Sequence, residues 1–342
     1  MKEDLKELYY EIKTYIEKVN FEILWKDFKP LKFALYNNDE CFFDGQYVHK
    51  TEQFIANTAI NYQGEIIAIW NVLEEIDPIV LASKMIHEMF HGFQMMNNES
   101  RFPDELDALY KYKYDDNNLS IKLEENKLLL KLLDVFDMDT FKKLLEFRKY
   151  RYDNYSYEYN YESKIEQIEG CANYIELNVL KQLSNELYQK KLDSIKKQIL
   201  SKENYFPIRV ISYDIGALLL LVLKDNKITF NDGFDSETFS ISLIKNVTNN
   251  ISIEKKCFKE DIDNYYDNAN SIIDKAIKGN DVIENEECNI VAVNVYNAIY
   301  YNNYIISTYF VMYEKDGNKK IEYGNFVIKS EKYKKLSKIY RY

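Results

Sequence analysis

Residues 77–94, DPIVLASKMIHEMFHGFQ, give the clearest indication of how the middle of this chain folds. Asp77 is a favoured helix N-cap, and Pro78 is favoured at the first helical position, so a helix begins here. No helix breaker follows before Gly92. Apolar side chains surround the segment almost completely, which predicts a helix that is buried on nearly every side.

Two histidines and a glutamate interrupt this apolar helix as an HExxH motif, His87-Glu88-Met89-Phe90-His91. Positions i and i+4 share one helix face, so both imidazoles can reach the same ion. Buried imidazoles need polar partners, and histidine is a good Zn²⁺ ligand. The motif therefore predicts a zinc site at His87 and His91. Glu88, beside it, would take a proton from water and deliver it to a leaving group.

A catalytic zinc needs a third protein ligand. His49 is the only other histidine, and the extended pattern HExxHxxGxxH is absent because positions 94 and 97 hold Gln and Asn. Residues 166–176, EQIEGCANYIE, offer glutamates instead. Gly170 follows Glu169 directly, and a glycine inside a helix is costly unless another element packs closely against it. We expect this segment to pack against helix 77–94 and to aim Glu169 at the ion.

Other glutamates compete for this role. Glu166 lies one turn before Glu169, and Glu162 and Glu176 lie near the same stripe. Each would otherwise belong to a solvated helix face, which is the usual place of glutamate. A glutamate that does not bind the ion could accept a hydrogen bond from the second ring nitrogen of a ligand histidine.

The two motifs together resemble the gluzincin group of zinc metallopeptidases. In that group a downstream E-G-x-A motif supplies the third ligand, and the resemblance implies Glu169 for this role. The extended forms His-Glu-x-Phe-His-x-Phe-Gln (87–94) and Glu-x-x-Glu-Gly-x-Ala-x-Tyr-x-Glu (166–176) are also similar to a group of uncharacterised bacterial peptidases. The likeness covers roughly residues 54–225. It implies an antiparallel edge strand before the motif helix, where an extended peptide could add as a further strand.

The spacing of the motifs departs from the compact gluzincins. His91 and Glu169 are 78 positions apart, and residues 104–150 between them look mostly helical. An extra helical pair or lid is expected there. The alternating tyrosines at 155–161 would either line a substrate cleft or pack the insert against the following helix.

Hydrolysis also requires a group that stabilises the developing oxyanion. Arg209 and Tyr213 precede a buried apolar run, and Tyr213-x-x-Gly216 would permit a close helix contact. In the resembled group a tyrosine from a later helix often has this role. The alternative is a tyrosine that only anchors its hydroxyl in the core.

The remaining pattern predicts an α+β fold, and the resemblance implies that it is zincin-like. We expect residues 1–75 to form a helix (3–19) and a small sheet with a hairpin (54–60 and 65–70), and residues 76–235 to form a helical catalytic region. Residues 250–342 would form a β-rich appendage. The expected helices are 122–133, 140–149, 161–200, 211–223 and 261–278, and the expected strands are 289–299, 304–314 and 320–329, with a turn at 316–317.

Composition narrows the class of protein. The 342 residues carry a formal net charge of −11 and include no dense Lys/Arg block, which argues against a nucleic-acid partner. The longest apolar run, residues 215–223, is too short to span a bilayer, and the N-terminus lacks the apolar core of a signal peptide. Four scattered cysteines suit reduced thiols.

We expect a cytoplasmic zinc metallopeptidase with a peptide or protein substrate. The alternatives are a non-enzymatic binding or regulatory protein on the same scaffold and a zinc hydrolase of another substrate.

Overall fold

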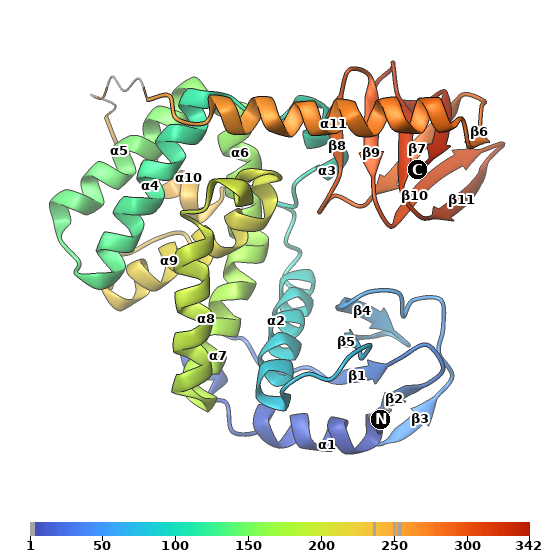
Figure 1. Cartoon of the computed structure of the whole chain (residues 1–342). Helices are drawn as coiled ribbons and strands as arrows, with labels where there is room; N and C mark the ends of the chain where they lie inside the picture. Colours follow the sequence, from blue (N-terminus) through green and yellow to red (C-terminus); the bar gives the residue numbers. More distant parts are fainter. Residues whose placement is uncertain (1–3, 235–236, 249–250, 252–254) are drawn as a thin grey trace.

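The computed structural model describes residues 4–234, 237–248, 251 and 255–342. The fold is α+β, as expected, and has three parts along the chain: an N-terminal sheet, a set of helices and a C-terminal pair of sheets (Figure 1). Part of the boundary expected near 235–250, and the first residue of the expected helix 3–19, lie outside the described residues.

The N-terminal part is a five-stranded sheet in the order β3-β2-β1-β5-β4, preceded by one helix. Its elements are α1 (Leu5–Ile16), η1 (Phe21–Ile23), β1 (Phe33–Tyr36), β2 (Cys41–Phe43), β3 (Gln46–Val48), β4 (Thr58–Tyr62) and β5 (Glu65–Asn71). The hairpin β4–β5 is confirmed, with β4 as an antiparallel edge strand. The expected start at 54 is wrong: β4 begins at Thr58. Before it, Asn57 accepts the backbone N–H of Asn71 with its side chain, in place of backbone pairing.

Helix α2 (Pro78–Met96) begins where the sequence predicts. The Asp77 carboxylate caps it by accepting the backbone N–H groups of Ile79 and Val80. The helix packs against β4 and β5 on one side and against α7 (Cys171–Leu183) on another. Its apolar side chains join the largest hydrophobic core of the described residues, which holds the HExxH motif in a buried helix.

The helical part lies on one side of α2 and contacts it through α7 (Figure 1). It consists of α3 (Glu105–Lys111), α4 (Asp116–Asp134), α5 (Met138–Asn154), α6 (Ser156–Ile165), the π-helical turn η2 (Glu166–Gly170), α7 (Cys171–Leu183), α8 (Asn185–Gln198), η3 (Lys202–Tyr205), α9 (Ile208–Asp225) and α10 (Phe239–Ile244). The single helix expected over 161–200 is wrong. Ser184 is extended (φ −155°, ψ 107°) and caps α8, because its side-chain oxygen accepts the N–H of Leu187.

Two glycines bring η2 and α9 into backbone contact. A Cβ atom on Gly170 would lie 2.7 Å from the Cα of Gly216, and one on Gly216 would lie 2.8 Å from the backbone oxygen of Glu166. The close approach that Gly170 permits is therefore to α9, and not to the HExxH helix as expected. The contact expected at Gly216 is present.

Replacing Gly216 with alanine is expected to destabilise the fold by about 3 kcal/mol, because its Cβ would meet backbone atoms that cannot rotate away. The measurement is the free energy of unfolding in urea. Gly279→Ala is the matched control, since nothing lies within 4 Å of a Cβ there. Equal stability of the two variants would show that η2 and α9 separate easily.

The C-terminal part is a pair of stacked sheets with one covering helix. Its elements are α11 (Lys259–Gly279), β6 (Val282–Glu284), β7 (Cys288–Val293), β8 (Ile299–Tyr301), β9 (Tyr304–Ser307), β10 (Phe310–Lys315), β11 (Asn318–Tyr323), β12 (Phe326–Lys329), β13 (Lys335–Leu336) and β14 (Lys338–Arg341). The sheets have the orders β11-β10-β7-β13 and β6-β14-β12-β9-β8. Apolar residues of both sheets share one core, and α11 covers the outer face of the second sheet.

The three long strands expected here are wrong, because turns divide them. A turn at residues 294–298, where the N–H of Asn297 donates to the backbone oxygen of Asn294, separates β7 from β8. Tyr309 (φ 74°) separates β9 from β10, and Gly324 (φ 140°) separates β11 from β12. The predicted turn at Asp316 and Gly317 is confirmed between β10 and β11. Asparagine and glycine tolerate such backbone angles better than other residues do.

Helix α3, from the helical insert, attaches the C-terminal part. Leu106, Leu109 and Tyr110 pack against the core shared by the two sheets. The Tyr110 hydroxyl lies 2.6 Å from the Oγ of Ser330. Tyr333 donates a hydrogen bond to Asp107 in the same contact. Among the described residues, no helix is long and apolar enough to cross a membrane.

Candidate metal centre

Side chains from α2 and η2 converge on one point. The Nε2 atoms of His87 and His91 are 3.1 Å apart. Oε2 of Glu169 lies 3.4 Å from Nε2 of His91 and 4.0 Å from Nε2 of His87. These side chains are 12–17% exposed, so the point is largely shielded from solvent but still accessible. Among the described residues, this is the group of His, Cys, Asp and Glu side chains placed to hold a metal ion.

The hydrogen bonds of Gln94 determine which ring nitrogen of His91 carries a proton. The Gln94 amide nitrogen donates to the backbone carbonyl of Ile168 at 3.0 Å, so its oxygen faces His91. That oxygen lies 2.8 Å from Nδ1 of His91 and can only accept. In neutral His91 the proton is therefore on Nδ1, and Nε2 presents a lone pair. Gln94 also ties α2 to η2 beside Glu169.

His87 is oriented in a related way by Glu176 of α7. An oxygen of Glu176 lies 3.5 Å from Nδ1 of His87, which is within ion-pair range but long for a hydrogen bond. Although burial opposes it, contact with His87 and the charges of Lys191 and Lys84 lower the pKa of Glu176 to about 2. An ionised carboxylate beside Nδ1 favours a proton on that nitrogen. Nε2 of His87 then also presents a lone pair.

The three donors fit a zinc ion. Two lone pairs and a carboxylate oxygen face one another, and neutral histidines place no proton between them. Such an arrangement is repulsive unless a cation occupies its centre. Ligands of a tetrahedral zinc, about 2.0–2.1 Å from the ion, lie about 3.3 Å apart. The observed separations of 3.1, 3.4 and 4.0 Å bracket this value.

The carboxylate beside the two histidines also favours a positive charge at this point. Although burial alone lowers it, the Glu169 carboxylate raises the pKa of His91 to about 9. Burial alone raises the pKa of Glu169, but His91, His87 and Arg209 lower it to about 2. Arg209 binds the other oxygen of Glu169 at 3.0 Å. One carboxylate oxygen therefore faces the histidines while the second is held from outside.

Two of the competing glutamates, Glu166 and Glu162, lie in a buried ionic network. Glu166 accepts hydrogen bonds from Arg148, at 2.5 Å, and from Ser240. Glu162 binds Arg151 and Lys122, both at 2.6 Å. These contacts join α4 and α5 to the segment that carries Glu169. His49 lies at the N-terminal sheet, in a surface hollow lined by residues 38–41 and 47–52.

An open cleft of about 280 Å³ borders the metal centre at His87. Glu88, His87 and Tyr213 line it together, and Glu88 is only 8% exposed. The remaining lining residues are Trp70, Lys84, Asn173, Glu176, Lys191, Gln198, Val210 and Asp214. The expected base and the expected tyrosine thus share a cleft with a histidine of the centre.

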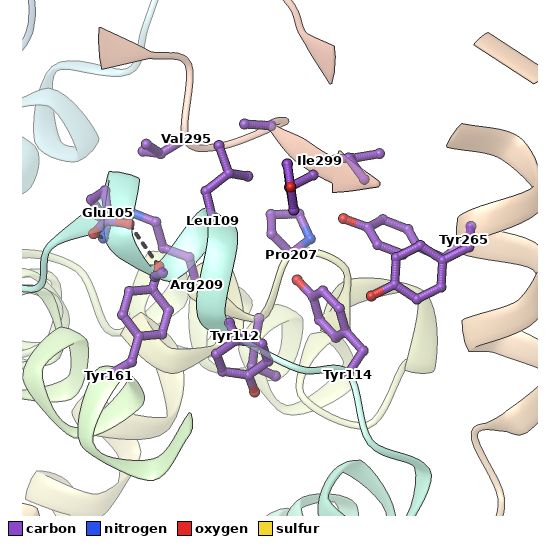
Figure 2. Close-up of a pocket in the computed structure, with 15 residues that line it drawn as sticks. Glu105, Leu109, Tyr112, Tyr114, Tyr161, Pro207, Arg209, Tyr265, Val295 and Ile299 are labelled. Carbon is purple, nitrogen blue, oxygen red and sulfur yellow. Dashed lines mark hydrogen bonds and ion pairs between the residues drawn. The ribbon is translucent and has the colours of Figure 1, made fainter. Parts of the chain in front are cut away.

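Arg209 lies on the other side of Glu169 and connects the centre to a second cavity of about 60 Å³ (Figure 2). Arg209 also forms an ion pair with Glu105 of α3, which accepts a hydrogen bond from Tyr161 at 2.7 Å. Both carboxylates are in direct contact with its guanidinium group. Of the two oxyanion candidates, Tyr213 is the one that lines the cleft.

Two contributors to this site, Gln94 and Glu105, are absent from the sequence expectations. Gln94 is three residues after His91 on the same helix, so its position could have indicated its contact. Glu176, by contrast, lies 3.5 Å from Nδ1 of His87, where a glutamate that does not bind the ion is expected from the sequence. Glu105 lies on a separate element, and no local pattern places it beside Arg209.

Comparisons with protein-family models, with curated proteins and with solved structures found no match to this chain. The geometry of the centre and its two motifs are therefore the features that indicate a function.

Proposed function

We propose that the protein is a zinc-dependent hydrolase of the gluzincin type, and that its substrate is a peptide or protein. The main observation in support of this proposal is the convergence of His87, His91 and Glu169 on one point, with Glu88 in the cleft beside them. A structural zinc site has no need of a carboxylate at the position of Glu88, whereas a hydrolytic site requires a base.

The residues have distinct roles in this proposal. His87, His91 and Glu169 hold the zinc, which supplies Lewis acidity when bound. Glu88 takes a proton from the attacking water and passes it to the leaving nitrogen. Tyr213 donates a hydrogen bond to the oxygen that becomes negative as the water adds. Gln94 and Glu176 keep the two histidines in the orientation and protonation that metal binding needs.

The N-terminal sheet supports a peptide as substrate. Strand β4 is the edge of the sheet, it packs against α2, and its outer backbone groups have no neighbouring strand in the sheet order (Figure 1). An extended peptide could pair with this edge by strand addition. The alternatives are a hydrolase of a non-peptide substrate and a binding protein in which zinc has no catalytic role.

The test is a peptide-library screen with zinc-loaded protein, followed by metal removal. We expect that the zinc-loaded protein cleaves at least one peptide. A chelator such as 1,10-phenanthroline should remove more than roughly 90% of that activity, and restoring zinc should recover it. The non-chelating isomer 1,7-phenanthroline is the control. Cleavage that survives complete zinc removal would contradict the proposal. Zinc binding without any cleavage would favour the binding protein.

A further inference from the structure

The C-terminal part reaches the proposed catalytic tyrosine through the loop between β7 and β8. The hydroxyl oxygens of Tyr296 and Tyr213 are 3.2 Å apart. The guanidinium carbon of Arg209 lies 5.1 Å from the ring centre of Tyr213 and 5.6 Å from that of Tyr296. One cation therefore contacts both rings, and the same cation binds Glu169. Through Tyr213 and Arg209, these contacts join the C-terminal loop to the metal centre.

The position of this loop is determined by the sheets behind it. Asn294 donates its backbone N–H to the Oγ of Ser307, at the end of β9, and its side chain accepts the N–H of Tyr296. Val295, next along the loop, lines the cavity behind Arg209 (Figure 2). The contact of α3 with the sheets holds the whole part in place. Tyr296 is thus presented to the cleft by a folded support, although its side chain is 51% exposed.

We propose that Tyr296 is a positioning residue for the hydrolytic site and that the C-terminal part is a working component of the catalytic unit. The proposal rests on the proposed function. A phenol has one proton to donate and can also accept. When Tyr296 donates to the Tyr213 oxygen, the proton of Tyr213 is directed away from Tyr296 and into the cleft that holds Glu88. Hydrogen bonds in such a chain also strengthen one another.

The chemistry at Tyr213 gives the expected kinetic effect. A donor that points at the developing oxyanion acts on the transition state, so its misalignment lowers kcat and leaves KM nearly unchanged. Tyr296→Phe keeps the ring, and with it the contact with Arg209, and removes only the hydroxyl. We expect this variant to lower kcat roughly 3- to 10-fold on a peptide cleaved by the wild type.

The test is a double-mutant cycle with the single variants Tyr296→Phe and Tyr213→Phe and their double variant. If Tyr296 acts through Tyr213, the double variant has the same kcat as Tyr213→Phe alone. Tyr333→Phe is the matched control: it removes a C-terminal hydroxyl that contacts α3 at Asp107, and we expect wild-type kcat. Thermal melting of each variant accompanies the kinetics.

Three results would overturn the proposal. The first is wild-type kcat in Tyr296→Phe, and the second is an additive loss in the double variant. An equal loss in Tyr333→Phe would assign the effect to general attachment of the C-terminal part and would also overturn it. Failure of the proposed function is distinguishable, since the wild type would then cleave no peptide while still binding zinc, or would bind no zinc.

Discussion

Proteins carrying His87→Ala or Glu169→Ala are expected to contain almost no zinc after purification without a metal-binding tag, whereas the wild type contains about one ion per chain. Zinc sites with four ligands contribute roughly 10–16 kcal/mol, so losing one ligand costs roughly 3 kcal/mol and weakens binding about 100-fold. Elemental analysis by mass spectrometry measures the zinc content directly. The carboxylate of Glu169 is also bound by Arg209, so its removal leaves that cation nearer to the histidines and opposes zinc further.

Glu166→Gln is the control for the ligand assignment. Its carboxylate is 1% exposed and bonded to Arg148 and Ser240, so this variant is expected to be less stable but to keep its zinc. Zinc lost from Glu166→Gln and kept by Glu169→Ala would transfer the ligand role to Glu166. A wild-type protein that takes up no zinc, even when zinc is added back, would remove the basis for a hydrolase.

Glu88→Gln is expected to lower the rate of peptide cleavage by about 10²–10⁴-fold while the zinc content stays at the wild-type level. The amide has nearly the same shape as the carboxylate, so the buried helix retains its packing. The amide of the Glu88→Gln variant, however, cannot accept the proton of the attacking water. The readouts are kcat on a peptide found by the library screen and zinc content from the same preparation.

An exposed glutamate of α8 provides the matched control, because Glu186→Gln makes the same chemical change away from the cleft. It is expected to retain full activity. Cleavage by Glu88→Gln at the wild-type rate would show that another group activates the water. Loss of both zinc and activity would mean that Glu88 supports the metal itself.

The motif helix could be derived almost completely from local sequence. Asp77 and Pro78 define its start because capping depends only on neighbouring residues. The i, i+4 spacing places His87 and His91 on one face because helix geometry is regular. Glu169 could be selected among the glutamates through the glycine that follows it and through the resemblance of its motif, and the structure places it beside both histidines.

Other features depended on contacts between distant segments. Gly170 indicates a close approach, but a glycine does not specify its partner, and the partner is α9. The break at Ser184 within the expected helix 161–200 follows from an extended residue and a side-chain cap, which helical periodicity alone does not reveal. The expected long C-terminal strands are divided by a turn at residues 294–298 and by Tyr309 and Gly324, whose φ angles are positive.

Short-range physics therefore accounts for the residues of the HExxH motif and for the helix that presents them, because capping and helical periodicity act over a few residues. Tertiary structure decided everything that joins separate segments: Glu166 turned inward to Arg148, Arg209 held between Glu105 and Glu169, and Tyr296 placed against Tyr213. These contacts connect residues 18 to 104 positions apart. Their partners are selected by packing of the whole chain, which leaves no periodic trace in the sequence.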